Sequence, residues 1–225
     1  MTNWMVVSLW WLAFGLTHIL LSSKALRPKL VARLGERGFL SVYSLVSLAT
    51  FVPLVSYYWQ HRHSGPLLWN LMIVPGMREL SIALSGLGLI TAVLAMIQPS
   101  PTSFGGSKIE ARGVLRITRH PLFMAMGLWG LSHCIVNSFA SDVVFFGGFA
   151  VFAVVGCAHQ DTRKRDRDNA ELEGFFEQTS FLPLGAILGG RQRLVLSELS
   201  SIGMAGGLGL AWLVYYLHAQ LRYWF

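Results

Sequence analysis

Six long apolar stretches constrain the fold of this chain more than any other feature of its sequence. Each is about 20 residues long, the length that an α-helix needs to cross roughly 30 Å of hydrocarbon. None has Asp, Glu, Lys or Arg near its centre. At 53% hydrophobic and 13% charged residues, the 225-residue chain is too apolar for a soluble domain of this length. We therefore predict an all-α, polytopic transmembrane helical bundle of about six spans, forming one domain over residues 1–225, with spans at 4–22, 40–59, 79–97, 121–138, 141–159 and 199–219.

The positive charges predict how this bundle is oriented. The formal net charge of +7 could suggest a nucleic-acid partner, but the cations are sorted by loop rather than gathered in one basic patch. Fifteen of the 18 Lys and Arg residues lie in the loops after the first, third and fifth spans, and only Arg62, Arg78 and Arg222 lie elsewhere. Cytoplasmic loops carry the excess of Lys and Arg. Both termini are therefore predicted on the non-cytoplasmic side, with the lipid bilayer as a partner and no nucleic acid.

Three local patterns predict how the spans connect and pack. Residues 24–39 contain Pro28, Gly35 and Gly38, which suggest a short interfacial helix and a turn into the second span. The polar stretch after residue 159 suggests that the fifth span continues as a charged helix, followed by an apolar interfacial segment. Gly203 and Gly207 are four residues apart in the last span, a spacing that lets helices approach closely.

The histidines are the first candidates for chemistry, because no span offers a central carboxylate. An imidazole inside hydrocarbon costs free energy unless it finds a partner, which makes an intramembrane histidine a candidate functional residue. His18 shares a helical face with Trp11 and Phe14, and His133 shares one with Trp129. An aromatic face that carries a histidine would accept a flat apolar ring. An ordinary contact between helices with one hydrogen bond would show the same pattern.

A second candidate site lies where the fourth predicted span begins. Pro121 suits the first turn of a helix, because no hydrogen bond is lost for its missing N–H. Arg116, Arg119 and His120 then stand beside free backbone N–H groups and the positive end of the helix dipole. We predict that these three residues bind an anion or a substrate carrying a carboxylate or phosphate. Anchoring to lipid phosphates is the alternative.

The depth of each histidine predicts which of them can meet. At 1.5 Å per residue, His18 lies about 6 Å and His133 about 18 Å from the cytoplasmic boundary of its span. His120 and His159 lie at a depth similar to that of His18. By this count His18 pairs with His120 or His159 rather than with His133. Asp161 follows His159 by two residues and is predicted to orient its ring.

Several stretches carry a resemblance to a known family over nearly the whole chain, in order. The chain resembles the NnrU family of membrane proteins, which is named for a link to bacterial denitrification and is similar to the 15-cis-zeta-carotene isomerases of plants and cyanobacteria. The matching stretches are residues 17–18, 21–23, 34–39, 43–45, 113–121, 128–133, 159–161 and 179–183.

The resemblance implies a cofactor and an activity. It implies haem b held by histidines that match His18 and His133 as metal ligands, and His159 and His120 stay as further candidates for binding the cofactor. It also implies isomerase-like or redox chemistry on a lipophilic polyene, or a denitrification-related role, in the inner membrane of a bacterium. Gly130 stands where the isomerase motif has a cysteine, and the isomerase's His-His pair in the fifth span has no counterpart.

Two other classes of protein fit part of the sequence. The R-x-x-R-H-P arrangement at the foot of a helix also resembles membrane methyltransferases, in which it helps to hold S-adenosylmethionine. Those enzymes pair the motif with a downstream acidic helix, for which Arg167, Asp168, Glu171 and Glu173 are the candidates here. The third class is a non-enzymatic accessory protein that supports the expression or assembly of nitrite and nitric oxide reductases.

Overall fold

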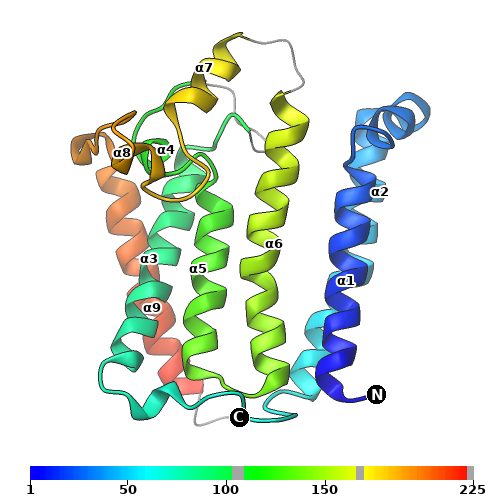
Figure 1. Cartoon of the computed structure of the whole chain (residues 1–225), viewed down its shortest axis with the longest axis vertical. Coiled ribbons are helices and arrows are strands. Elements are labelled where there is room, and N and C mark those ends of the chain that lie inside the picture. The colour runs from blue at the N-terminus through cyan, green and yellow to red at the C-terminus, as the bar shows by residue number, and fades with distance from the viewer. Residues whose placement is uncertain (103–108, 166–169, 222–225) are drawn as a thin grey trace.

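The structure, a computed structural model, describes residues 1–102, 109–165 and 170–221, and all regular elements among them are helices. Figure 1 shows the long helices side by side, with the short ones gathered mainly at one end. The long helices are α1 (Asn3–Leu21), α2 (Arg27–Gln60), α3 (Met77–Ile97), α5 (Pro121–Val136), α6 (Ala140–Arg165) and α9 (Ser201–Leu221). The short ones are η1 (Leu71–Ile73), α4 (Val114–Ile117), α7 (Ala170–Gln178), α8 (Gly185–Leu188) and η2 (Leu196–Glu198).

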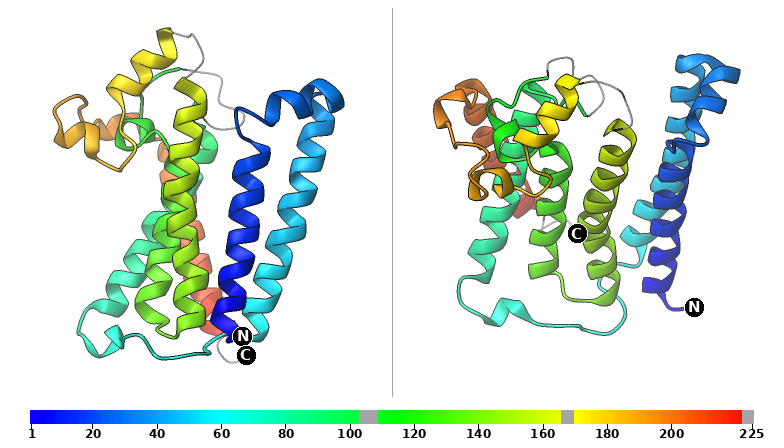
Figure 2. Two further views of the ribbon diagram at one scale, coloured as in Figure 1. Left: turned by 45° about the vertical axis from the view of Figure 1, so that its right-hand side comes forward. Right: turned by 45° about the horizontal axis from the view of Figure 1, so that its top comes forward.

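The long helices pack in an order that differs from their order in the chain. α1 pairs with α2 and also packs against α6; α6 packs against α5, α5 against α3, and α3 against α9. The views in Figure 2 agree with this arrangement and show the α1–α2 pair beside α6. The all-helical fold that was predicted is confirmed.

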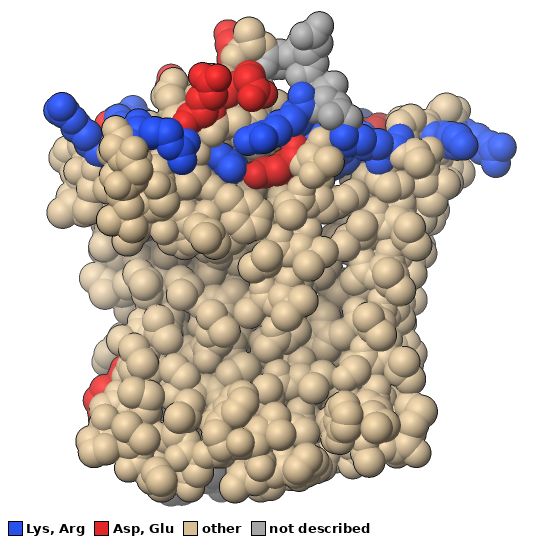
Figure 3. Space-filling model, viewed as in Figure 1, with Lys and Arg blue, Asp and Glu red and all other residues tan. Residues whose placement is uncertain are grey.

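Among the described residues, four helices, α1, α2, α3 and α6, are long and apolar enough to cross a membrane, and α5 is a shorter apolar helix. Large apolar side chains stay exposed along them, as at Leu45 and Val151, which suits contact with lipid tails. Figure 3 shows Lys and Arg in a band at one end of the molecule, here called the charged end, and an almost uncharged surface below it. α1 begins and α9 ends at the opposite end (Figure 1).

The helix boundaries refine the predicted spans. α2 begins at Arg27, well before the predicted start at residue 40, because the interfacial helix and the span are joined in one run. Gly35 interrupts that run with φ 71° and ψ 167°, so the predicted turn is present within it. α6 continues to Arg165, which confirms the charged continuation of the fifth span. α5 ends at Val136, two residues earlier than predicted.

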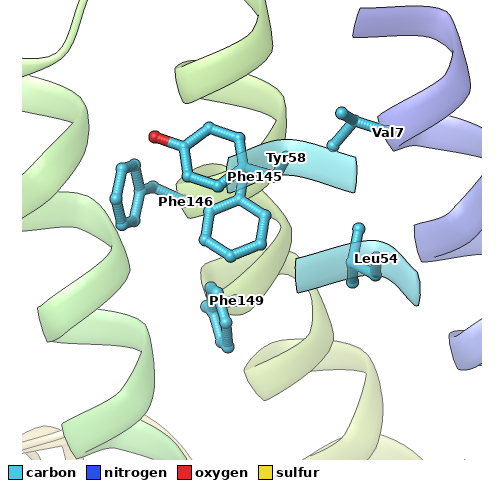
Figure 4. Packing of buried hydrophobic residues seen from close by; sticks show 6 residues of the cluster. All are labelled: Val7, Leu54, Tyr58, Phe145, Phe146 and Phe149. Atoms are coloured by element: carbon cyan, nitrogen blue, oxygen red, sulfur yellow. The ribbon is translucent and has the colours of Figure 1, made fainter. Parts of the chain in front are cut away.

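An aromatic core joins α1, α2 and α6. Figure 4 shows the buried cluster of Val7, Leu54, Tyr58, Phe145, Phe146 and Phe149. The rings of Tyr58 and Phe145 stack with centroids 3.8 Å apart and an interplanar angle of 4°. Phe145 also meets Phe146 and Phe149 edge to face, with centroids 5.2 and 5.5 Å apart, an arrangement that adds stability beyond the burial of area. The core lies toward the end away from the charged end, because Val7 and Phe145 are near the starts of α1 and α6, which begin at that end (Figure 1).

Small residues allow the closest contacts between helices. A Cβ atom at Gly207 of α9 would lie 2.8 Å from the Cα of Ile90 in α3, so only glycine permits this approach. The predicted close packing through the last span is therefore confirmed. The Trp11 ring of α1 fills the space over Gly148 of α6, and its Nε1 donates a hydrogen bond of 3.1 Å to the carbonyl of Phe145.

Candidate functional site

His18 lies near the end of α1 that faces the charged end, among rings from three helices. Its ring centroid is 5.2 Å from Phe14 of α1, 4.7 Å from Tyr43 of α2 and 5.2 Å from Phe152 of α6. The Nδ1 atom lies 3.2 Å from Oγ of Ser47. His18, Tyr43 and Phe152 are half-buried rather than sealed in the core. We call His18 and the rings of Phe14, Tyr43 and Phe152 the aromatic wall.

His159 reaches the same turn of α1 from α6. Its Nε2 lies 3.0 Å from Oγ of Ser22, and that hydroxyl donates a 2.7 Å hydrogen bond to the carbonyl of His18. Tyr43 donates from Oη to the same carbonyl at 3.4 Å. The prediction that His18 and His159 lie at one depth is confirmed. The prediction that Asp161 orients His159 is wrong, because the Asp161 carboxylate binds two other side chains.

Asp161 instead lies at the centre of a buried hydrogen-bonded cluster at the charged end. Its Oδ1 lies 2.6 Å from Nε2 of His120, and its Oδ2 accepts a 2.9 Å hydrogen bond from Nε of Arg119. The same guanidinium donates to the carbonyls of Phe176, at 3.1 Å, and Thr179, at 2.9 Å. His120 and Arg119 are only 2% and 7% exposed. The cluster joins α6, the start of α5 and the segment after α7.

Arg116 lies outside that cluster and forms an ion pair with a carboxylate. Its Nε and Nη2 donate to the two oxygens of Glu198 at 2.7 and 2.8 Å, and Gln192 accepts from Nη1. The backbone N–H of Gly113 adds a third hydrogen bond to Glu198. The Arg116 guanidinium and this N–H hold the pKa of Glu198 at about 2. Both arginines of the motif thus have partners within the chain, and the anion site stays a prediction.

His133 lies at the other end of α5. Its Nδ1 is 2.9 Å from the carbonyl of Trp129, which marks that nitrogen as the protonated one, and its ring stacks on Phe146 with centroids 4.6 Å apart. The ring is therefore packed in the aromatic core rather than at the aromatic wall.

Phe149 contacts both α1 and α5, so it serves as a common level from which the positions of His18 and His133 along the bundle can be counted. Trp11 of α1 and Trp129 of α5 both pack against Phe149, at 4.9 and 5.1 Å. From that level His18 lies seven residues toward the charged end and His133 four residues away from it, an axial separation of about 16 Å. A bond from a metal to imidazole is about 2 Å, so two axial ligands of one iron lie roughly 4 Å apart. The separation of about 16 Å refers to Cα positions, and the rings come closer than that: they pack on Phe152 and Phe146, which lie about 9 Å apart along α6, still more than this ligand spacing.

The part of the chain that the structure describes also holds no group of three or more His, Cys, Asp or Glu side chains placed to bind a metal ion. Of the four histidines singled out in the sequence, His18 and His159 come together at the aromatic wall. His120 is engaged with Asp161, and His133 lies apart.

Sequence reasoning missed a buried carboxylate at the end away from the charged end. Asp142, in the first turn of α6, is fully buried and accepts hydrogen bonds from Tyr58 Oη and from the backbone N–H of His63, both at 3.0 Å. Its second oxygen lies 2.9 Å from Nδ1 of His63. The signal was available, since Asp142 is a carboxylate inside a predicted span.

The close contact between α5 and α6 explains why residue 130 is a glycine. A Cβ atom there would lie 2.4 Å from the carbonyl oxygen of Phe146 and 3.0 Å from Cβ of Phe149. The two helices therefore leave no room for the cysteine that the isomerase motif carries at this place.

The fold and the candidate site define an all-helical membrane protein with half-buried histidines set among aromatic rings. The chain belongs to the NnrU family, because the family's sequence profile, described as NnrU protein, matches residues 6–224. The resemblance seen in the sequence motifs is thereby confirmed.

Two curated plant proteins are similar to this chain. The 15-cis-zeta-carotene isomerase, chloroplastic, of Arabidopsis thaliana is 29% identical over 189 residues, covering 81% of this chain and 50% of that protein. The protein of the same name from Zea mays is 27% identical over 163 residues, covering 71% and 44%. The chain thus spans about half the length of these relatives. No solved structure matches.

Proposed function

We propose that this protein is an isomerase-like membrane protein that acts on a lipophilic polyene at the aromatic wall. The observation that carries the proposal is the half-buried imidazole of His18 among rings of three helices. The names of the relatives support the same reaction class, since both are called isomerases of a carotene. A conjugated polyene is flat and apolar, and aromatic faces suit it.

Access from the bilayer supports this substrate class. Leu16 and Leu20 of α1 and Leu45 and Leu48 of α2 are exposed apolar side chains on the helices that carry the aromatic wall. A polyene dissolved in the hydrocarbon can therefore approach this surface without crossing water.

The proposed step is a reversible proton transfer. Isomerisation about a double bond requires its bond order to fall while the bond rotates. The neutral ring carries its proton on Nδ1, which faces the Ser47 hydroxyl, so the acid is the minor form of His18 that is also protonated at Nε2. Nε2 of that form gives its proton to the polyene, so that a C–H bond forms and the double bond becomes a delocalised cation. After rotation the proton returns to Nε2 and the double bond forms again, with no net oxidation or reduction. Aromatic faces such as those of Phe14 and Tyr43 stabilise a nearby cation.

Haem b bound through His18 is a separate proposal that rests on the family resemblance. When bound, haem would supply a redox-active iron at the aromatic wall. His133 lies apart from His18, with its ring on Phe146, whereas His159 approaches the same turn of α1 as His18. An absorption spectrum of protein purified after haem supplementation tests it. A haem band lost in His18→Ala and kept in His61→Ala is expected, and equal bands in both variants would refute it.

We also propose the finer topology. α1, α2, α3, α5, α6 and α9 form six spans of one domain, the charged end is cytoplasmic, and both termini lie outside the cytoplasm of a bacterial inner membrane. The band of Lys and Arg in Figure 3 supports this orientation. The denitrification-related accessory role stays a prediction, since no contact within the chain favours it.

The isomerase proposal is tested in liposomes that contain the purified protein and 15-cis-zeta-carotene. We expect the wild type to change the ratio of isomers, measured by chromatography, and His18→Ala to lose at least about 90% of the rate, in line with the 10²–10⁴-fold worth of a general acid. His61→Ala is the matched control, because His61 stacks on Tyr57 at the opposite end of α2. An unchanged isomer ratio with the wild type, or equal rates in the two variants, would reject the proposal.

A further inference from the structure

A pocket of about 810 Å³ opens at the charged end, apart from the aromatic wall. It lies between residues 109–116, α7 and Glu198, and its size falls in the range of sites for small organic molecules. Figure 1 shows α7 and α4 together at this end of the molecule. The side chains that matter for recognition are Ile109, Glu110, Arg112, Arg116, Glu171 and Phe175.

The two arginines of the R-x-x-R-H-P motif lie in different places. Arg119 points into the buried cluster with Asp161, whereas Arg116 lines the pocket. The charge of Arg116 is already balanced by the two-point contact with Glu198. The motif thus builds one wall of the pocket without leaving its own cations free.

Three other charges at the pocket have no such partner. Within residues 1–102, 109–165 and 170–221, the side chains of Glu110, Glu171 and Arg112 make no hydrogen bond or ion pair. All three are exposed. Two carboxylates and one guanidinium match a ligand that carries two positive centres and one carboxylate, with a net charge of +1. Ile109, Ala111 and Phe175 add an apolar lining for a flat ring.

We propose that this pocket binds a nucleoside-sized amino-acid derivative with a second positive centre, the class to which S-adenosylmethionine belongs. Its carboxylate pairs with Arg112, and its ammonium and sulfonium face Glu110 and Glu171. The proposal concerns a second site and does not depend on the polyene site. Of the acidic-helix candidates in the sequence, Glu171 lines the pocket and Glu173 does not, and Arg167 and Asp168 lie outside the described residues.

Isothermal titration of the full-length protein in detergent with S-adenosylmethionine tests the site. We expect saturable binding that is about threefold or more tighter than that of S-adenosylhomocysteine, which lacks the sulfonium charge. Glu171→Gln should weaken binding about three- to fivefold. Glu173→Gln, at another exposed position of the same helix, is the matched control and should bind as the wild type does. Arg112→Gln and Arg193→Gln form a second pair with the same expectation.

Two results would overturn the proposal: no saturable binding by the wild type, or equal affinities in Glu171→Gln and Glu173→Gln. His18→Ala separates this site from the polyene site, because it should retain wild-type affinity for S-adenosylmethionine. A loss of that affinity in His18→Ala would contradict the separation of the two sites.

Discussion

Asp161 shows how helix geometry, rather than nearness in sequence, decides the partner of a side chain. Residues two apart on a helix point to nearly opposite sides, so Asp161 cannot face His159. It meets His120, 41 positions away, because α5 begins beside this turn of α6. No pattern in the sequence indicates that these two turns lie side by side. It did predict that His120 and Arg119 matter, because cations and an imidazole at a membrane boundary need partners.

Removal of Arg119 should destabilise the protein. Arg119→Ala leaves the largely buried Asp161 carboxylate without its guanidinium, and truncation of one partner of a buried pair costs about 3–5 kcal/mol. The unfolding midpoint in detergent, followed by tryptophan fluorescence, should fall well below that of Arg37→Ala, an exposed control on α2. Equal midpoints for the two variants would show that the cluster is not structural.

The contact between Arg116 and Glu198 should make stability depend on pH in the acid range. Glu198 has its pKa lowered from 4.5 to about 2 in the folded protein, so its contribution is fully present above about pH 4.5 and is lost as the pH falls toward 2. Glu198→Gln should therefore be less stable than the wild type at pH 7, and the difference should shrink at pH 3 and below. A difference that stays constant over this range would contradict the assignment.

At the scale of elements, α6 packs so closely against α1 and α5 that the contact positions Gly148 and Gly130 leave no room for a larger side chain. The spans were predictable because their apolar length exceeds that of ordinary core helices. Their ends were less predictable: α2 includes the interfacial helix, because the chain turns sharply at Gly35 and a second helix follows at once. The closeness of α5 and α6 could not be predicted, because Gly130 alone does not reveal which helix lies opposite it.

Gly130→Cys tests the contact of α5 with α6. The new side chain would meet the Phe146 carbonyl, so α5 and α6 must shift, at a cost of about 1–3 kcal/mol. Gly209→Cys on α9 is the matched control, since no atom lies within 4 Å of a Cβ built there. A large fall of the thermal midpoint is expected only for Gly130→Cys, and similar midpoints would mean that the two helices are not packed this closely.

At the scale of the whole molecule, most Lys and Arg side chains gather at one end of an otherwise mainly apolar bundle (Figure 3). The fold class and the band of cations in Figure 3 were predictable from the sequence, because loop charges and span lengths follow from the bilayer itself. The site was predictable only in part. His18 and His159 were correctly placed at one depth by counting residues, whereas the buried Asp142 with Tyr58 and His63 depends on how α2 and α6 meet.

The proposed orientation can be measured by labelling single cysteines. In a background with Cys134→Ser and Cys157→Ser, we expect Arg62→Cys to react in intact cells with a maleimide that cannot cross membranes. Arg193→Cys, at the charged end, should react only after the cells are opened. The reverse pattern would place the charged end outside the cytoplasm.

The central claim is that a polyene is isomerised at the aromatic wall, where His18 acts. The most direct test compares His18→Ala with His133→Ala in the liposome assay with 15-cis-zeta-carotene, after both variants are shown to be folded by their thermal midpoints. His18 packs on Phe152 at the aromatic wall and His133 on Phe146 in the aromatic core, so only one of them belongs to the wall. Loss of isomerisation in His18→Ala, with most of the rate kept in His133→Ala, is the predicted result. Loss in His133→Ala with activity kept in His18→Ala would contradict it.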